Sequence, residues 1–182
     1  MNKRSLITIP VFILFAASIL WLWASPGGLS KAPDIKLTIT DGSLIELQQL
    51  RGKPVIVTFW ATSCVGCVRE MPHLMALYDE LSSDGLEIIG IAMPYDPPNQ
   101  VVTMISEKEI PYPVAIDIEG NAIAAFGDVL VTPTSFLIAP DGTIAKRTIG
   151  EMDITELRNS IISMLPNKNT ITGLNSISGP PS

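Results

Sequence analysis

Apolar residues recur along most of the chain at the spacings of strands and helices. Short apolar, β-branched runs at residues 55–60, 87–92 and 114–116 predict buried strands. Spacings of three and four predict helices at residues 65–83, 99–109, 121–126 and 154–165. Two further strands, 135–139 and 143–149, flank the turn sequence Pro140-Asp141-Gly142. Strands that alternate with helices predict an α/β fold, in which helices flank a central mixed sheet.

The longest helix, at residues 65–83, carries one clearly apolar face. Its members recur with the period of an α-helix: Val68, Met71, Met75, Tyr78 and Leu81. Because such a stripe is buried in most soluble domains, we expect this face to pack against the sheet, with both methionines in the core.

The first 24 residues differ in character from the rest. Lys3 and Arg4 precede an uncharged stretch, 6–23, whose 18 residues are close to the minimum for crossing a hydrocarbon core ~30 Å thick. We predict a signal anchor and transmembrane helix at 1–24, with its N-terminus in the cytoplasm and the remaining chain outside. Cleavage near Ala24 remains open, although Trp23 is large where a cleavage site favours small residues.

The remainder divides into a linker, one domain and a tail. The 182 residues are 47% apolar, which suits one domain plus an appendage. Pro26-Gly27-Gly28 indicates a linker at 25–31, and alternation around Asp41-Gly42 predicts a β-hairpin at 35–47, at the start of a domain spanning 32–166. Asn, Ser, Gly and Pro dominate 167–182, which predicts a disordered tail. A net charge of −6 without a basic run gives no support for nucleic-acid binding.

Both cysteines, Cys64 and Cys67, lie where the strand at 55–60 gives way to the long helix. At a helix start, unpaired backbone N–H groups and the helix dipole favour a thiolate over a thiol. A structural zinc site usually needs four Cys or His ligands, and His73 is the only histidine. A permanent crosslink over so short a loop would stabilise the fold little. We therefore interpret the pair as a redox-active dithiol that requires neither a metal nor a dissociable cofactor.

Several separated motifs carry a family resemblance. The segment from Thr58 to Pro72, with Cys64-Val65-Gly66-Cys67 inside it, resembles the thioredoxin superfamily. The Glu-Met-Pro sequence at 70–72, Ala-Pro-Asp at 32–34 and Leu-Arg-Gly-Lys-Pro at 50–54 resemble the membrane-anchored TlpA/ResA-like thiol-disulfide oxidoreductases. The segment 131–138 resembles the one that carries a cis-proline facing the disulfide in this family. The resemblance implies a thioredoxin-like fold with an extra N-terminal hairpin.

The same resemblance implies roles for the residues around the cysteines. Its position at the helix start already makes Cys64 the expected nucleophile, and Cys67 is expected to resolve the mixed disulfide. Glu70 is expected to transfer protons, the alternative being a solvated carboxylate favoured by the helix dipole. Substrate binding is expected at three positions, with a cis peptide bond at the last: Trp60, Thr132 and Pro133.

The sequence also departs from the family pattern. Thr58 stands where thioredoxin has a buried aspartate, so Glu70 is expected to take over part of its work as a base. Ser63 stands before Cys64 where tryptophan is more frequent in the family, which leaves less apolar surface for a target. Val65-Gly66 replaces Gly-Pro between the cysteines, and the reduction potential therefore does not follow from the motif.

The resemblance implies a disulfide reductase on the outer side of a bacterial inner membrane, facing the periplasm. Its expected partners are disulfide-containing extracytoplasmic proteins such as apocytochrome c, a membrane reductant of the DsbD/CcdA type and the lipid bilayer. A DsbA-type oxidase and a non-catalytic binding module remain alternatives. A peroxiredoxin is disfavoured by Ala61, which occupies the position of an expected threonine, and a Sco-type copper protein by the cysteine spacing.

Overall fold

The computed structural model describes residues 30–166. The predicted membrane anchor at 1–24, most of the linker and the tail at 167–182 lie outside the described residues. Within residues 30–166, none of the helices combines the length and the apolar composition that crossing a bilayer requires.

A five-stranded mixed sheet forms the centre of the domain, in the order β5-β4-β3-β6-β7. The central strand β3 (Val55–Trp60) pairs in parallel with β4 (Glu87–Ala92), and β4 pairs in parallel with β5 (Val114–Ile116). On its other side, β3 pairs antiparallel with β6 (Thr134–Ile138), which pairs antiparallel with β7 (Ile144–Ile149). All six residues of β3 are buried, which explains why all of them except Thr58 are apolar.

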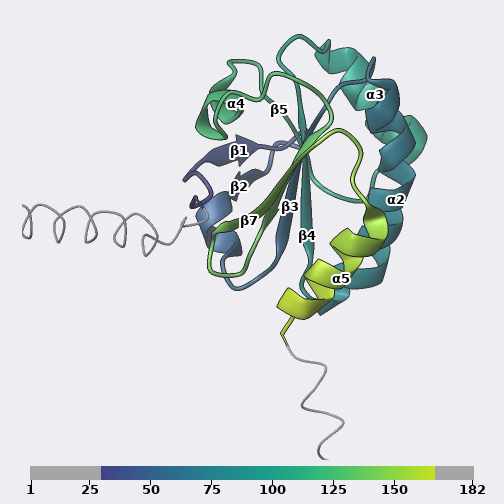
Figure 1. Ribbon diagram of the computed structural model, residues 1–182. Coiled ribbons are helices and arrows are strands. Elements are labelled where there is room, and N and C mark those ends of the chain that lie inside the picture. The colour runs from purple at the N-terminus through teal and green to yellow at the C-terminus, as the bar shows by residue number, and fades with distance from the viewer. Residues whose placement is uncertain (1–29, 167–182) are drawn as a thin grey trace, which may run out of the picture. The chain divides into compact units, whose positions relative to one another are not determined.

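Helices cover both faces of this sheet (Figure 1). On one face lie α2 (Val65–Leu81), α3 (Pro98–Lys108) and α5 (Ile154–Met164). On the other lie α4 (Asn121–Ala125) and a hairpin of β1 (Lys36–Thr38) and β2 (Leu44–Glu46). Two short 3-10 helices, η1 (Leu47–Leu50) and η2 (Ser82–Asp84), follow β2 and α2. The predicted α/β fold with an extra N-terminal hairpin is thus confirmed.

The alternation of side chains along β3 divides the core into two clusters. Val57 and Phe59 point to the hairpin side, where Phe59 makes edge-to-face contacts with Phe126 and Phe136 at centroid distances of 5.4 and 6.0 Å. Ile56 and Trp60 point to the opposite side and pack with α2, α3 and α5. The central strand is therefore buried on both faces, and α2 packs against it.

The buried face of α2 differs from the predicted one. The residues that are buried along it are Cys67, Glu70, Met71, Leu74, Leu77 and Leu81. Met71 lies in the core as predicted, whereas Met75 and Tyr78 are only partly buried at its edge. The face is rotated because α5 also packs on this side of the sheet, contributing Leu157 and Ile161 to the same cluster. As a result Glu70 turns inward.

Candidate active site

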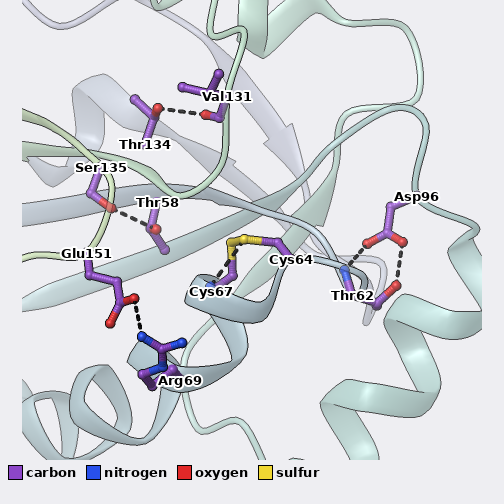
Figure 2. The surroundings of a disulfide bond; sticks show 10 residues. All are labelled: Thr58, Thr62, Cys64, Cys67, Arg69, Asp96, Val131, Thr134, Ser135 and Glu151. Carbon is purple, nitrogen blue, oxygen red and sulfur yellow. Dashed lines mark hydrogen bonds and ion pairs between the residues drawn. A yellow bond between two sulfur atoms is a disulfide. The ribbon is translucent and has the colours of Figure 1, made fainter.

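Cys64 occupies the N-cap position of α2, in the extended conformation with φ −85° and ψ 104°. Its sulfur accepts a hydrogen bond from the backbone N–H of Cys67 at 3.2 Å and is joined to the sulfur of Cys67 in a disulfide (Figure 2). An N-cap atom faces unpaired N–H groups and the positive end of the helix dipole. The predicted position of Cys64 at a helix start is confirmed, and its surroundings favour a thiolate after reduction.

The two sulfur-bearing residues differ in accessibility. Cys64 is half-buried, whereas Cys67 is 4% exposed and belongs to the core cluster beneath α2. Because thiol-disulfide exchange needs direct approach to a sulfur, Cys64 is the one that a large partner can reach.

A neutral polar pair lies to one side of the disulfide (Figure 2). The hydroxyl of Ser135 donates a hydrogen bond to Oγ1 of Thr58 at 2.9 Å, and both residues are buried on neighbouring strands β6 and β3. Position 58 thus places a hydroxyl, and no carboxylate, at the point where thioredoxin has its aspartate.

The segment before β6 approaches the cysteine loop closely. The Thr132–Pro133 peptide bond is cis, as predicted, and Pro133 is buried. A Cβ atom placed on Gly66 would lie 3.5 Å from Cδ of Pro133, so the two segments are in van der Waals reach. The hydroxyl of Thr134 donates to the carbonyl of Val131 at 2.7 Å and closes the turn around this proline (Figure 2).

Glu70 is buried, with 3% of its surface exposed. Its Oε1 accepts a hydrogen bond from the backbone N–H of Met152 at 2.6 Å. Burial raises the pKa of the Glu70 carboxyl, the hydrogen bond from Met152 opposes that rise, and the charge of Glu151 adds to it. The alternative of a solvated carboxylate is therefore wrong.

Trp60, the last residue of β3, is only 4% exposed. It belongs to the same core cluster as Cys67, and its indole Nε1 would lie 3.1 Å from a Cβ atom on Gly90. A side chain enclosed in this way offers a target very little surface. Thr132, by contrast, is half-buried beside the cis-proline.

Sequence reasoning missed Asp96, which fixes the loop before Cys64. Asp96 is 3% exposed; its Oδ2 accepts from the backbone N–H of Thr62 at 2.6 Å and its Oδ1 from the Thr62 hydroxyl at 2.5 Å (Figure 2). Thr62 follows β3 and Asp96 follows β4. Since these strands are parallel neighbours, their carboxyl ends meet at one edge of the sheet. An acidic residue just after a predicted strand was the available signal.

Glu151 is a second residue that the sequence did not single out. It lies between β7 and α5, and its Oε1 pairs with Nη1 of Arg69 at 2.8 Å (Figure 2). The same oxygen would lie 3.4 Å from a Cβ atom on Gly66, so a carboxylate borders the cysteine loop. His73 is exposed on α2.

Comparison with known proteins identifies the family. The model of the AhpC/TSA family matches residues 29–147. The chain belongs to the AhpC/TSA family. Among curated proteins, a thiol-disulfide oxidoreductase ResA of Bacillus cereus is 35% identical over 136 residues, which cover 75% of this chain and 78% of that protein. ResA of Bacillus subtilis (strain 168) is 34% identical over 123 residues, covering 68% of each chain.

Solved structures agree with the fold. A putative thioredoxin from Neisseria meningitidis is 30% identical, with a TM-score of 0.70 over 82% of this chain and 99% of that one. StoA from Bacillus subtilis is 26% identical, with a TM-score of 0.59 over 69% of this chain and 93% of that one. The family, these relatives and the Cys64–Cys67 disulfide identify this member of the AhpC/TSA family as a thiol-disulfide oxidoreductase.

Proposed function

We propose that the protein reduces disulfides in target proteins on the extracytoplasmic side of a bacterial inner membrane. The observation that carries this proposal is the asymmetry of its cysteines. Cys64 is accessible at the N-cap of α2, while Cys67 is enclosed beneath it. Such a reaction needs an accessible thiolate that attacks the target disulfide and a second, protected thiolate that resolves the mixed disulfide.

In each cycle the thiolate of Cys64 attacks one sulfur of the target disulfide, and the other target sulfur leaves as a thiolate. The thiolate of Cys67 then attacks the sulfur of Cys64 and expels the second target thiolate. The protein dithiol loses two electrons and becomes the disulfide seen here, while the target disulfide gains them and becomes two thiols.

Glu70 handles the protons in this proposal. Because burial raises its pKa, the Glu70 carboxyl holds a proton up to a higher pH than an exposed glutamate does. Such a group is better suited to accept and release protons during exchange. Replacing Glu70 by Gln keeps an acceptor oxygen for Met152 and removes the titrating group. The expected result is a changed pH dependence of alkylation of the reduced thiols. An unchanged profile would remove Glu70 from the mechanism.

The target docks over an apolar rim near the disulfide. Val65, between the cysteines, is 72% exposed, and Leu130 and Val131, just before the cis-proline, are 83% and 51% exposed. Exposed apolar side chains gathered beside a reactive group are typical of a protein-binding surface. An extended segment of the target lies against Thr132 and Pro133, which keeps its disulfide beside Cys64.

The N-terminal segment anchors the domain in the bilayer, and a membrane thiol-transfer protein of the DsbD/CcdA type returns electrons to the pair. The composition of residues 1–24 supports the anchor. Apocytochrome c is a target of suitable chemistry, because its paired cysteines must be reduced before haem attachment. Another solved structure of similar fold, a putative thiol:disulfide interchange protein DsbE from Chlorobium tepidum, is 25% identical with a TM-score of 0.69.

Catalysis is tested by reduction of insulin with dithiothreitol. The full chain is expected to accelerate the reaction and Cys64→Ser to abolish the acceleration. Cys67→Ser should accumulate a mixed disulfide between Cys64 and the target, because the resolving step is missing. If insulin is reduced at the same rate with and without the protein, the protein is a binding module and not an enzyme.

The direction of electron flow is tested by the reduction potential, measured in dithiothreitol or glutathione buffers with thiol trapping. A value near or below that of thioredoxin, about −270 mV, is expected of a reductant. A value near that of DsbA, about −120 mV, would instead make the protein a disulfide donor.

A further inference from the structure

A polar groove flanks Cys64 on the side of α3. It has a volume of about 300 Å³ and is lined by Thr62, Ser63, Asn99, Gln100, Thr103, Met104 and Glu107. In Figure 2, Thr62 and Asp96 lie on the opposite side of the disulfide from Glu151 and Ser135. The groove shares no lining residue with the apolar rim at Val65, Leu130 and Val131, yet its wall includes Ser63, the residue adjacent to Cys64.

The wall next to Cys64 is held in place before any target arrives. Asp96 accepts two hydrogen bonds from Thr62, and the Thr62 hydroxyl also lies 3.4 Å from Oε1 of Gln100 on α3. These contacts connect the cysteine loop to α3. Because this wall is already ordered, little conformational entropy of the protein is lost when a ligand binds.

Most of the residues that line the groove are polar, and one of them is acidic. Among the described residues that line it, Glu107 is the charged one, and the buried carboxylate of Asp96 lies directly behind Thr62. In the part of the chain that the structure describes, neither acid forms a salt bridge. Ser63, the residue before Cys64, is small and forms part of the lining. A cationic side chain with hydrogen-bonding capacity fits this lining.

We propose that the groove binds the part of the target polypeptide that flanks the attacked cysteine, and that it selects lysine or arginine there. The inference rests on the proposed function, because the groove acts on the same exchange at Cys64. The groove adds a charge preference that the apolar rim does not supply. The rim contributes binding affinity for the target, and the groove contributes selectivity between targets.

The test uses three peptide disulfides that differ in one position. Each is a homodimer of a short peptide with a single cysteine, flanked by lysine, glutamine or glutamate. The full chain, reduced beforehand, is mixed with each, and the rate of oxidation of Cys64 and Cys67 is followed by thiol trapping. The lysine peptide is expected to react roughly two- to five-fold faster than the glutamine peptide, which is the factor that a partly exposed ion pair supplies.

Three variants locate the preference. Glu107→Gln should bring the lysine-to-glutamine rate ratio close to one, and Glu107→Lys should favour the glutamate peptide. Glu109→Gln, which removes the same charge just beyond α3 and outside the groove, should leave the ratio unchanged.

Equal rates for all three peptides would overturn the groove proposal while leaving the proposed function intact. A lysine preference that survives Glu107→Gln would also overturn it, because the preference would then not come from the charge in the groove. Failure to reduce any of the peptides would refute the proposed function itself, and the groove proposal with it.

Discussion

Two carboxylates, Glu70 and Asp96, are buried to the same degree near one disulfide and are held in different ways. Each is 3% exposed. Both oxygens of Asp96 accept hydrogen bonds, and both donors belong to Thr62 in the cysteine loop. Glu70 receives its bond from the N–H of Met152 at one oxygen, and its pKa is raised by burial.

The comparison shows that burial alone does not assign a role to an acid. A carboxylate anchored at both oxygens fixes the segment that donates to it, so Asp96 is a positioning residue for the loop that ends at Cys64. A carboxyl group with a raised pKa can bind and release a proton, so Glu70 suits proton transfer.

The largest effect is expected from Asp96→Ala. Removing the acceptor leaves the N–H and hydroxyl of Thr62 without their partner, which should lower the free energy of unfolding by roughly 2–3 kcal/mol. Urea denaturation of the oxidised protein measures this change. Asp96→Asn keeps the shape and one acceptor oxygen, so it should cost less than half as much. A loss below about 0.5 kcal/mol for the alanine variant would contradict the anchoring role.

Glu70→Gln is expected to change the slope of stability against pH. Because the folded protein holds the Glu70 proton more tightly than the unfolded chain, the stabilising contribution is complete below the ordinary pKa near 4.5 and is lost as pH rises through the folded pKa. The Gln variant lacks this loss, so its unfolding free energy should fall less between acidic and neutral pH. Denaturation midpoints across that range test it; parallel curves would mean that Glu70 ionises freely in the fold.

A smaller effect is expected at the neutral pair of Thr58 and Ser135. Ser135→Ala leaves the buried hydroxyl of Thr58 without its partner, at a cost of about 1 kcal/mol. The double variant with Thr58→Val should cost less than the sum of the two single changes, because both polar groups are then gone. Strict additivity in denaturation experiments would show that the two hydroxyls are not coupled.

The smallest effect is expected from Arg69→Ala. The ion pair between Arg69 and Glu151 is exposed, with side-chain exposures of 64% and 43%. Such pairs contribute little in water, so the unfolding free energy should change by no more than about 0.5 kcal/mol. Thermal denaturation at low and high salt is the measurement, and a large salt-dependent loss would show that this bridge fixes the loop beside Gly66.

The elements of the fold followed closely from sequence periodicity. The bounds of β3, β4 and β5 are those predicted, and the helices differ from prediction by one or two residues at their ends. The long helix ends at Leu81, earlier than expected, because the chain tightens into η2 and then turns at Gly85 with φ +114°. Local rules suffice here because hydrogen bonds within helices and the burial of strands depend mostly on neighbouring residues.

The candidate active site could be predicted from the sequence only in part. The redox pair, the helix start at Cys64 and the cis bond before Pro133 depend on short contiguous motifs, and they were predicted. The burial of Glu70 was not predicted, because the apolar stripe of α2 does not indicate where α5 packs. Substrate binding at Trp60 stays a prediction; the motif alone did not indicate that this side chain is only 4% exposed, since the last residue of β3 can point to either face.

The sequence by itself therefore determined the disulfide chemistry and the order of strands and helices, since both are written in contiguous residues. Tertiary structure decided which side chains from distant segments surround that chemistry. Asp96 reaches Thr62 across 34 positions, and Glu70 reaches Met152 across 82. These contacts depend on strand order and helix packing, which place the β4–α3 and β7–α5 loops beside the cysteines, and no local pattern encodes that placement.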